Sequence, residues 1–139
     1  MTIQTVLGFD YGTRRIGIAT GQTITSSATP LITLDNINHK PDWTAIGHLI
    51  EQWKPDALIV GLPTYLDGSH SEMTEKALKF SRQLQGRYNL PVHTINESLS
   101  SFEAEQELQQ YKKIGQHNKP EIDKMAAAII VQSWLEQIT

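Results

Sequence analysis

The chain is 139 residues long with a formal net charge of −3, 39% hydrophobic residues and 19% charged residues. That length fits one domain over residues 1–139 with a real hydrophobic core, and the composition is too apolar for a disordered chain. The chain has no cysteine, which excludes thiol nucleophiles and thiolate metal sites, and it has no signal-peptide pattern or membrane-length apolar run, so we expect a cytoplasmic protein.

The N-terminal part of the sequence predicts antiparallel strands. Two apolar runs, 6–9 and 16–19, flank residues 11–14, whose glycine suits a tight connection, and this pattern is typical of a hairpin. Residues 28–34 favour a third strand, and Pro30 within that segment indicates an edge of the sheet. The chain is therefore expected to begin with three neighbouring strands.

Helices and strands then alternate along the middle of the chain. Apolar residues recur at helical spacing from 43 to 53 and again from 73 to 84. The continuous apolar run 57–60 is typical of a strand buried on both faces at the sheet centre, and 92–95 predicts another strand. A strand, a helix and a strand in that order imply that the two strands are parallel.

Two further helices are predicted at the C-terminal end. Ser100 followed by Glu103 is a capping-box pattern for the first, and Pro120 is expected in the first turn of the second. The fold class is therefore α/β, with a mixed five-stranded sheet flanked by helices on both faces. An antiparallel hairpin and a third strand come first, and parallel strands follow.

Three carboxylates stand out from this framework. Asp10 ends an apolar strand, where a buried carboxylate without a partner would be costly. Glu97 follows the strand 92–95, at the end of the sheet where α/β proteins bind ligands. Successive side chains of a strand face opposite sides, so only one of Asn96 and Glu97 can join Asp10, and Glu97 is the anionic one. Asp123 is expected in the first turn of the last helix, whose dipole would favour its charged form.

A shared location of these carboxylates predicts a specific chemistry. Neighbouring carboxylates repel one another, and their pKa values rise unless hard cations hold them ionised. Oxygen ligands suit Mg²⁺ or Mn²⁺, and two such ions roughly 4 Å apart could activate water and stabilise the leaving oxygen of a phosphoryl displacement. Asp10, Glu97 and Asp123 are thus predicted to bind metal and to catalyse hydrolysis of phosphodiester bonds.

Each carboxylate also has a purely structural explanation. Asp123 could complement the helix dipole, and Glu97 could be a surface acid that precedes a helix. Asp10 could form an Asx-type turn with Gly12. Only the conjunction of the three favours a catalytic site.

Basic residues near the predicted site could contact the phosphates of a nucleic acid. These candidates are Arg14, Arg15, Lys112, Lys113 and Lys119. Ordinary solvated surface is the alternative for each lysine. The five histidines include no pair at metal-ligand spacing, and His93, inside a strand, is expected to be packed rather than catalytic.

Four blocks of the sequence, in this order, resemble the YqgF family of pre-16S ribosomal RNA nucleases. They are residues 8–19, Gly61-Leu62-Pro63 with Asp67-Gly68-Ser69, residues 96–101, and residues 123–127. The resemblance spans nearly the whole chain. It implies a ribonuclease H-like fold related to Holliday-junction resolvases, with metal-dependent nuclease action in 5′-end maturation of small-subunit ribosomal RNA. It also places Asp10, Glu97 and Asp123 on the family's acidic positions.

The chain departs from the family's pattern around Glu97. The family typically has Asp-Glu-Arg where this chain has Asn96-Glu97-Ser98. If the aspartate were a metal ligand, Asn96 would weaken metal binding, and loss of the arginine at Ser98 removes a possible phosphate contact or salt bridge.

Three other functions stay open at this point. The first is resolution of branched DNA by a homodimer, whereas RNA trimming needs only a monomer. The second is an ATP-binding kinase-like protein, since residues 10–13 also resemble a phosphate loop, although the chain has room for only one of the two domains that such proteins pair. The third is a non-catalytic RNA-binding module in ribosome assembly, in which the three carboxylates are vestigial.

Overall fold

The computed structural model describes residues 3–97 and 119–138. Its sheet contains β1 (Thr5–Tyr11), β2 (Arg15–Gln22), β3 (Ser27–Asp35), β4 (Ala57–Leu62) and β5 (Val92–Asn96), in the order β3-β2-β1-β4-β5. The helices of the described part are α1 (Trp43–Trp53), α2 (Glu72–Tyr88) and α4 (Lys119–Ile138). None of these helices is long and apolar enough to cross a membrane.

The strand directions confirm the predicted mixed sheet. β1, β2 and β3 are antiparallel neighbours, whereas β1 is parallel to β4 and β4 is parallel to β5. β3 lies at an edge, as Pro30 indicates. β4 is an interior strand as predicted, but the middle position belongs to β1, which joins the antiparallel and parallel halves. The helix predicted from Ser100 lies outside the described residues.

Local capping determines where the first two helices begin and end. Asp42 accepts a hydrogen bond from the Ala45 amide, 3.1 Å away, and begins α1. Ser71 and Thr74 form a capping box at the start of α2. Lys54 and Asn89 end the two helices in the left-handed conformation, with φ values of 46° and 54°. A proline follows shortly after each end.

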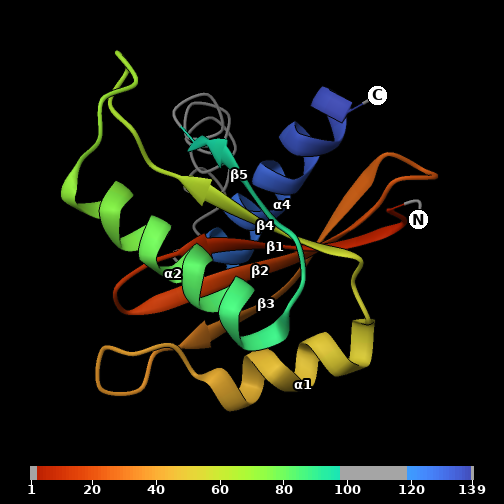
Figure 1. Cartoon of the computed structure of the whole chain (residues 1–139), viewed down its shortest axis with the longest axis horizontal. Helices are drawn as coiled ribbons and strands as arrows, with labels where there is room; N and C mark the ends of the chain where they lie inside the picture. The colour runs from red at the N-terminus through yellow and green to blue at the C-terminus, as the bar shows by residue number, and fades with distance from the viewer. Residues whose placement is uncertain (1–2, 98–118, 139) are drawn as a thin grey trace.

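The helices cover both faces of the sheet, with α1 and α2 on one face and α4 on the other (Figure 1). Leu7 and Phe9 of β1 belong to the core beneath α1 and α2, whereas Val6 belongs to the core beneath α4. Side chains alternate along a strand, so Asp10 lies on the α4 face. The sheet therefore presents the end of β1 to α4.

Glycines let α4 approach the sheet very closely. A Cβ added to Gly17 of β2 would lie 2.0 Å from the backbone oxygen of Asp123, and one added to Gly61 of β4 would lie 2.5 Å from Ile130 Cδ1. Only a residue without a side chain permits a contact of this kind. The start of α4 is thereby held against the end of the hairpin.

Candidate active site

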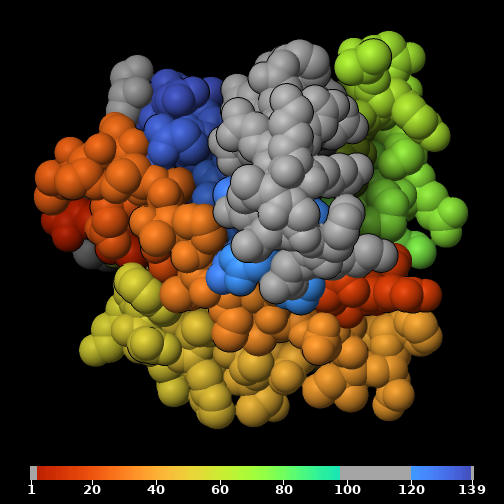
Figure 2. Space-filling model, turned by 180° about the vertical axis from the view of Figure 1, so that it is seen from behind, coloured from red at the N-terminus to blue at the C-terminus, as the bar shows by residue number. Residues whose placement is uncertain are grey.

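Asp10, Glu97 and Asp123 all lie on the α4 side of the sheet, near one of its ends. Asp10 is opposite Gly17 in the antiparallel ladder, and Gly17 contacts the backbone of Asp123. Glu97 directly follows β5 and has the same facing as Ile95, which packs in the core beneath α4. Figure 2 shows the start of α4, in light blue, beside the first strands, in red and orange.

Gly61 explains how Glu97 reaches Asp10 across an intervening strand. β4 separates β1 from β5, so a side chain on β4 at this level would stand between the two carboxylates. A Cβ at Gly61 would lie only 3.3 Å from the carboxyl carbon of Glu97. The glycine after the apolar run 57–60 is the signal that could have revealed this gap in the sequence.

The carboxyl groups of Asp10 and Glu97 are hydrogen-bonded to each other. Burial, the Glu97 charge and its hydrogen bond, and the Asp123 charge raise the pKa of Asp10 well above its ordinary range. Burial also raises the pKa of Glu97, while the hydrogen bond to Asp10 opposes that rise. The two carboxyl groups therefore resist being ionised together when no cation is bound.

Asp123 is held by an arginine. Arg15 Nε donates to Asp123 Oδ2 at 2.8 Å, and both side chains are about one-quarter exposed. The prediction that Asp123 lies in the first turn is wrong, because α4 begins at Lys119 and Asp123 is its fifth residue. The helix dipole acts mainly within the first turn, so Arg15 is the main local source of positive charge on Asp123.

The side chains of the two residues after Ile95 face opposite sides of the sheet, as predicted. Glu97 is 9% exposed and hydrogen-bonded to Asp10. The alternative explanation, that Glu97 is only a surface acid preceding a helix, is therefore wrong. Asn96 is exposed, and its Oδ1 accepts a hydrogen bond from Thr64 Oγ1 at 2.5 Å. An aspartate at position 96 would thus face away from Asp10.

The other predicted residues occupy different environments. Arg14 is exposed in the turn between β1 and β2. Lys112, Lys113 and Ser98 lie outside the described residues, and Lys119 is the first residue of α4. His93 packs against Trp134, with ring centroids 5.5 Å apart, as expected for a packed histidine.

The donor set suits a hard divalent cation, because it consists of carboxylate oxygens. Burial also makes it unfavourable to ionise Asp10 and Glu97 together, and a bound cation would offset that cost. Over residues 3–97 and 119–138, no three side chains of the ligating types are already grouped around one point. Asp123 Oδ2 is engaged by Arg15, so only the pair is assembled.

The sequence is similar to a known family and to named proteins over nearly its full length. Residues 4–137 match the family RuvX, described as Holliday junction resolvase. Proteins of Pseudomonas putida and Azotobacter vinelandii, each named "Putative pre-16S rRNA nuclease", are 48% and 47% identical to the chain. The alignments cover 99% and 95% of this chain, and 98% and 93% of those proteins.

Two solved structures share the fold at low sequence identity. Thermus thermophilus RuvC in complex with a Holliday junction substrate has a TM-score of 0.57 at 16% identity, covering 97% of this chain and 95% of RuvC. The fowlpox virus resolvase in complex with Holliday junction DNA has a TM-score of 0.59 at 12% identity, covering 97% and 99%.

The fold is therefore the ribonuclease H-like fold of the resolvases, and the chain is a nuclease of that class. Within this class it belongs to the RuvX family, also called YqgF, as the full-length relatives show.

Proposed function

We propose that the chain hydrolyses phosphodiester bonds of precursor 16S ribosomal RNA, with Asp10, Glu97 and Asp123 as its catalytic carboxylates. The observation that carries this proposal is the hydrogen-bonded Asp10–Glu97 pair, which lies on the same face as Asp123 at one end of the sheet. The RNA substrate is inferred from relatives that are 46–48% identical and bear that name. Because ribosomes of bacteria are made in the cytoplasm, we place the activity there.

Mg²⁺ or Mn²⁺ is the cofactor that these residues would hold. Bound there, the cation would supply charge neutralisation and activation of water for the phosphoryl displacement. Asp10 and Glu97 would hold the cation in their ionised forms. Arg15 donates to Oδ2 of Asp123, which keeps the carboxylate turned toward β2. Among the described residues no hydrogen bond to its second oxygen is found, and that oxygen would be the ligand.

The basic residues proposed to contact phosphates are Arg14, Arg15, Lys112, Lys113 and Lys119. Arg14 is exposed and flanks the site, as a phosphate contact requires. Arg15 already pairs with Asp123, so its first role is to position that carboxylate.

The deciding experiment measures cleavage of labelled pre-16S ribosomal RNA and of a four-way DNA junction, each with Mg²⁺, Mn²⁺ or chelator. Asp10→Asn should reduce the rate to below about one-thousandth of wild type, because it removes a charge that the transition state needs while keeping the side-chain shape. Asp35→Asn is the matched control, since Asp35 is an exposed aspartate at the end of β3. Wild-type rates in Asp10→Asn would sink the assignment of the site.

Resolution of branched DNA by a homodimer is the second candidate function, because the family description and the solved relatives are resolvases. Symmetric cutting of the junction, with no cutting of the RNA, would establish it. If folded wild type cuts neither substrate, the function moves to a non-catalytic RNA-binding module in ribosome assembly.

A further inference from the structure

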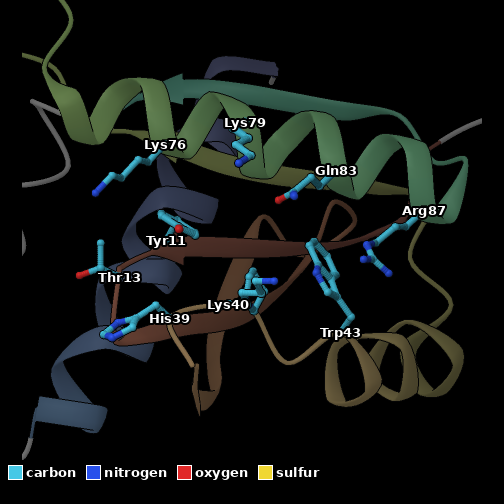
Figure 3. Close-up of a pocket in the computed structure, with 10 residues that line it drawn as sticks. Tyr11, Thr13, His39, Lys40, Trp43, Lys76, Lys79, Gln83 and Arg87 are labelled. Carbon is cyan, nitrogen blue, oxygen red and sulfur yellow. The ribbon is translucent and has the colours of Figure 1, made fainter. Parts of the chain in front are cut away.

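A groove of about 770 Å³ lies on the sheet face opposite Asp123, between α2 and the segment that connects β3 to α1 (Figure 3). Its lining comes from the end of β1 and the following turn, from the β3–α1 connection and the start of α1, and from one side of α2. The lining residues are Tyr11, Thr13, His39, Lys40, Pro41, Trp43, Lys76, Lys79, Gln83 and Arg87.

The groove concentrates positive charge in a chain whose net charge is −3. Four of the 12 lysines and arginines of the chain line it, and none of the lining residues is acidic. Lys76 is 3.6 Å from Glu72, but both side chains are well exposed, so this pair neutralises little. Lys40 and Lys79 form no ion pair with any residue of the described part. The charge is therefore available to an anionic ligand.

Both walls of the groove are built from regular backbone. Lys76, Lys79, Gln83 and Arg87 recur at intervals of three and four residues, so they form one stripe along α2. The opposite wall is a tight turn in which Ile37 and Lys40 exchange two backbone hydrogen bonds, of 2.8 and 3.0 Å. Asn38 and His39 between them both have positive φ, as a two-residue hairpin turn requires.

An aromatic contact fixes one of the cations. Trp43 stacks on Phe80 with centroids 5.6 Å apart, and the Arg87 guanidinium lies 4.2 Å from the centroid of the same indole ring. A guanidinium that stacks on an aromatic ring is already restricted in its conformations. It therefore loses less conformational entropy when its N–H groups bind a phosphate. The groove thus contains a preorganised phosphate donor as well as exposed lysines.

The groove and the acidic site lie on opposite faces of the sheet and are linked by neighbouring residues of β1. Tyr11, which lines the groove, directly follows Asp10, and its side chain faces the α2 side of the sheet. Thr13 belongs to the turn that also carries Arg14. A nucleic-acid strand that crosses this turn would pass from the face of the acidic site to the face of the groove.

We propose that this groove binds a single-stranded segment of the nucleic-acid substrate, adjacent to the bond that is cut. The inference rests on the proposed function, and it adds the path of the substrate. From Lys76 to Arg87, α2 rises by about 16 Å, which is long enough to follow several phosphates of one strand. Two facing walls suit one chain of phosphates, and a positive groove with aromatic residues is the usual form of a single-strand site.

Binding of a fluorescein-labelled 12-nucleotide uridine RNA in chelator tests the proposal, since no cleavage occurs under those conditions. Lys79→Glu should weaken binding about five- to ten-fold at 100 mM salt. It should also reduce the slope of log affinity against log salt by about 0.7, the value for one phosphate on a single strand. Arg82→Glu is the matched control, because Arg82 is an exposed residue of the same helix that does not line the groove. It should leave both quantities near wild type.

Three outcomes would overturn the proposal. One is equal affinity of wild type and Lys79→Glu, and another is an equal loss in Arg82→Glu. The third concerns competition by adenosine monophosphate and by unlabelled 12-mer RNA, compared at equal nucleotide concentration. If adenosine monophosphate displaces the labelled RNA as well as the 12-mer does, the groove binds a small phosphate ligand. If Lys79→Glu does not fold, Lys40→Glu makes the same test from the other wall.

The readout also separates this inference from the nuclease assignment. Weaker RNA binding by Lys79→Glu, together with no cleavage by wild type, would support the groove and sink the proposed chemistry. Cleavage that depends on Asp10, together with unchanged RNA binding by Lys79→Glu, would do the reverse.

Discussion

The two faces of the sheet differ in how closely a helix approaches them. On one face, Gly17 and Gly61 bring α4 into direct contact with the strands and close the acidic site. On the other face, the rings of Phe9, Phe80 and Trp43 hold the helices away from the strands. The first face buries two carboxylates, and the second leaves an open groove lined by cations.

This difference shows that the size of the packed residues determines where buried carboxylates and where solvated cations can lie. Carboxylates with raised pKa values need a site from which water is largely excluded, and small residues create one by letting backbones meet. Phosphate-binding lysines need solvent and space, which bulky aromatic residues preserve at the mouth of a groove. The two sites should therefore respond differently to changes in packing and charge.

The largest effect should follow from closing the space at Gly17. Gly17→Ala places a Cβ about 2 Å from the backbone oxygen of Asp123, an atom that cannot rotate away. We expect a loss of about 3 kcal/mol in the free energy of unfolding, near the upper end for overpacked sites, and cleavage should fall with it. Chemical denaturation measures the loss.

The matched control is Gly86→Ala on α2. Gly86 has nothing within 4 Å of its added Cβ among the described residues, so the methyl group meets open space. Alanine in a helix interior should raise stability by about 0.5–1 kcal/mol. A similar loss of stability in both variants would show that the two faces do not differ in packing.

A metal-dependent reversal of stability should come next in size. The raised pKa of Asp10 means that its ionised form is disfavoured in the folded state. Without bound cations, stability therefore falls as pH rises above the pKa of the unfolded chain and toward the raised pKa of the folded protein. In chelator at neutral pH, Asp10→Asn should therefore be more stable than wild type, by on the order of 1 kcal/mol.

Adding Mg²⁺ or Mn²⁺ should reverse that order. Metal at 100 times its dissociation constant stabilises the folded protein by about 2.7 kcal/mol, and the variant should lack most of this gain. Thermal unfolding with and without metal measures both effects. Lys79→Glu, on the other face, should keep the full response to metal, and an equal metal response in Asp10→Asn would contradict the proposed ligands.

Sequence patterns were sufficient for the described strands and helices and for deciding which of Asn96 and Glu97 faces Asp10. Hydrophobic periodicity reports which side of a strand is buried, and the alternation at Ile95, Asn96 and Glu97 predicts which side chain faces Asp10. The pairing of Arg15 with Asp123 was not predictable, since these residues are 108 positions apart and meet only when α4 docks on β2. The role of Gly61 depends equally on the order of the strands.

The basic groove could not be predicted from the sequence either, because its two walls are distant in the sequence and meet only in the fold. The stripe on α2 can be read from the helical spacing of Lys76, Lys79 and Arg87, but a stripe of cations on a helix is ordinary solvated surface until a second wall faces it. That wall comes from the turn at 37–40, and its position depends on how β3 connects to α1.

Substitution of Arg15 should have the smallest effect on stability. It also tests whether Arg15 positions Asp123 or contacts the substrate. Because its ion pair with Asp123 is partly exposed, Arg15→Gln should cost at most about 1 kcal/mol in the free energy of unfolding. If Arg15 positions Asp123, the substitution should lower kcat about ten-fold and leave KM nearly unchanged. Arg14→Gln, one residue away in the exposed turn, should instead raise KM with little change in kcat, as loss of a phosphate contact predicts. A raised KM in both variants would make Arg15 a substrate contact and would leave Asp123 without its positioning residue.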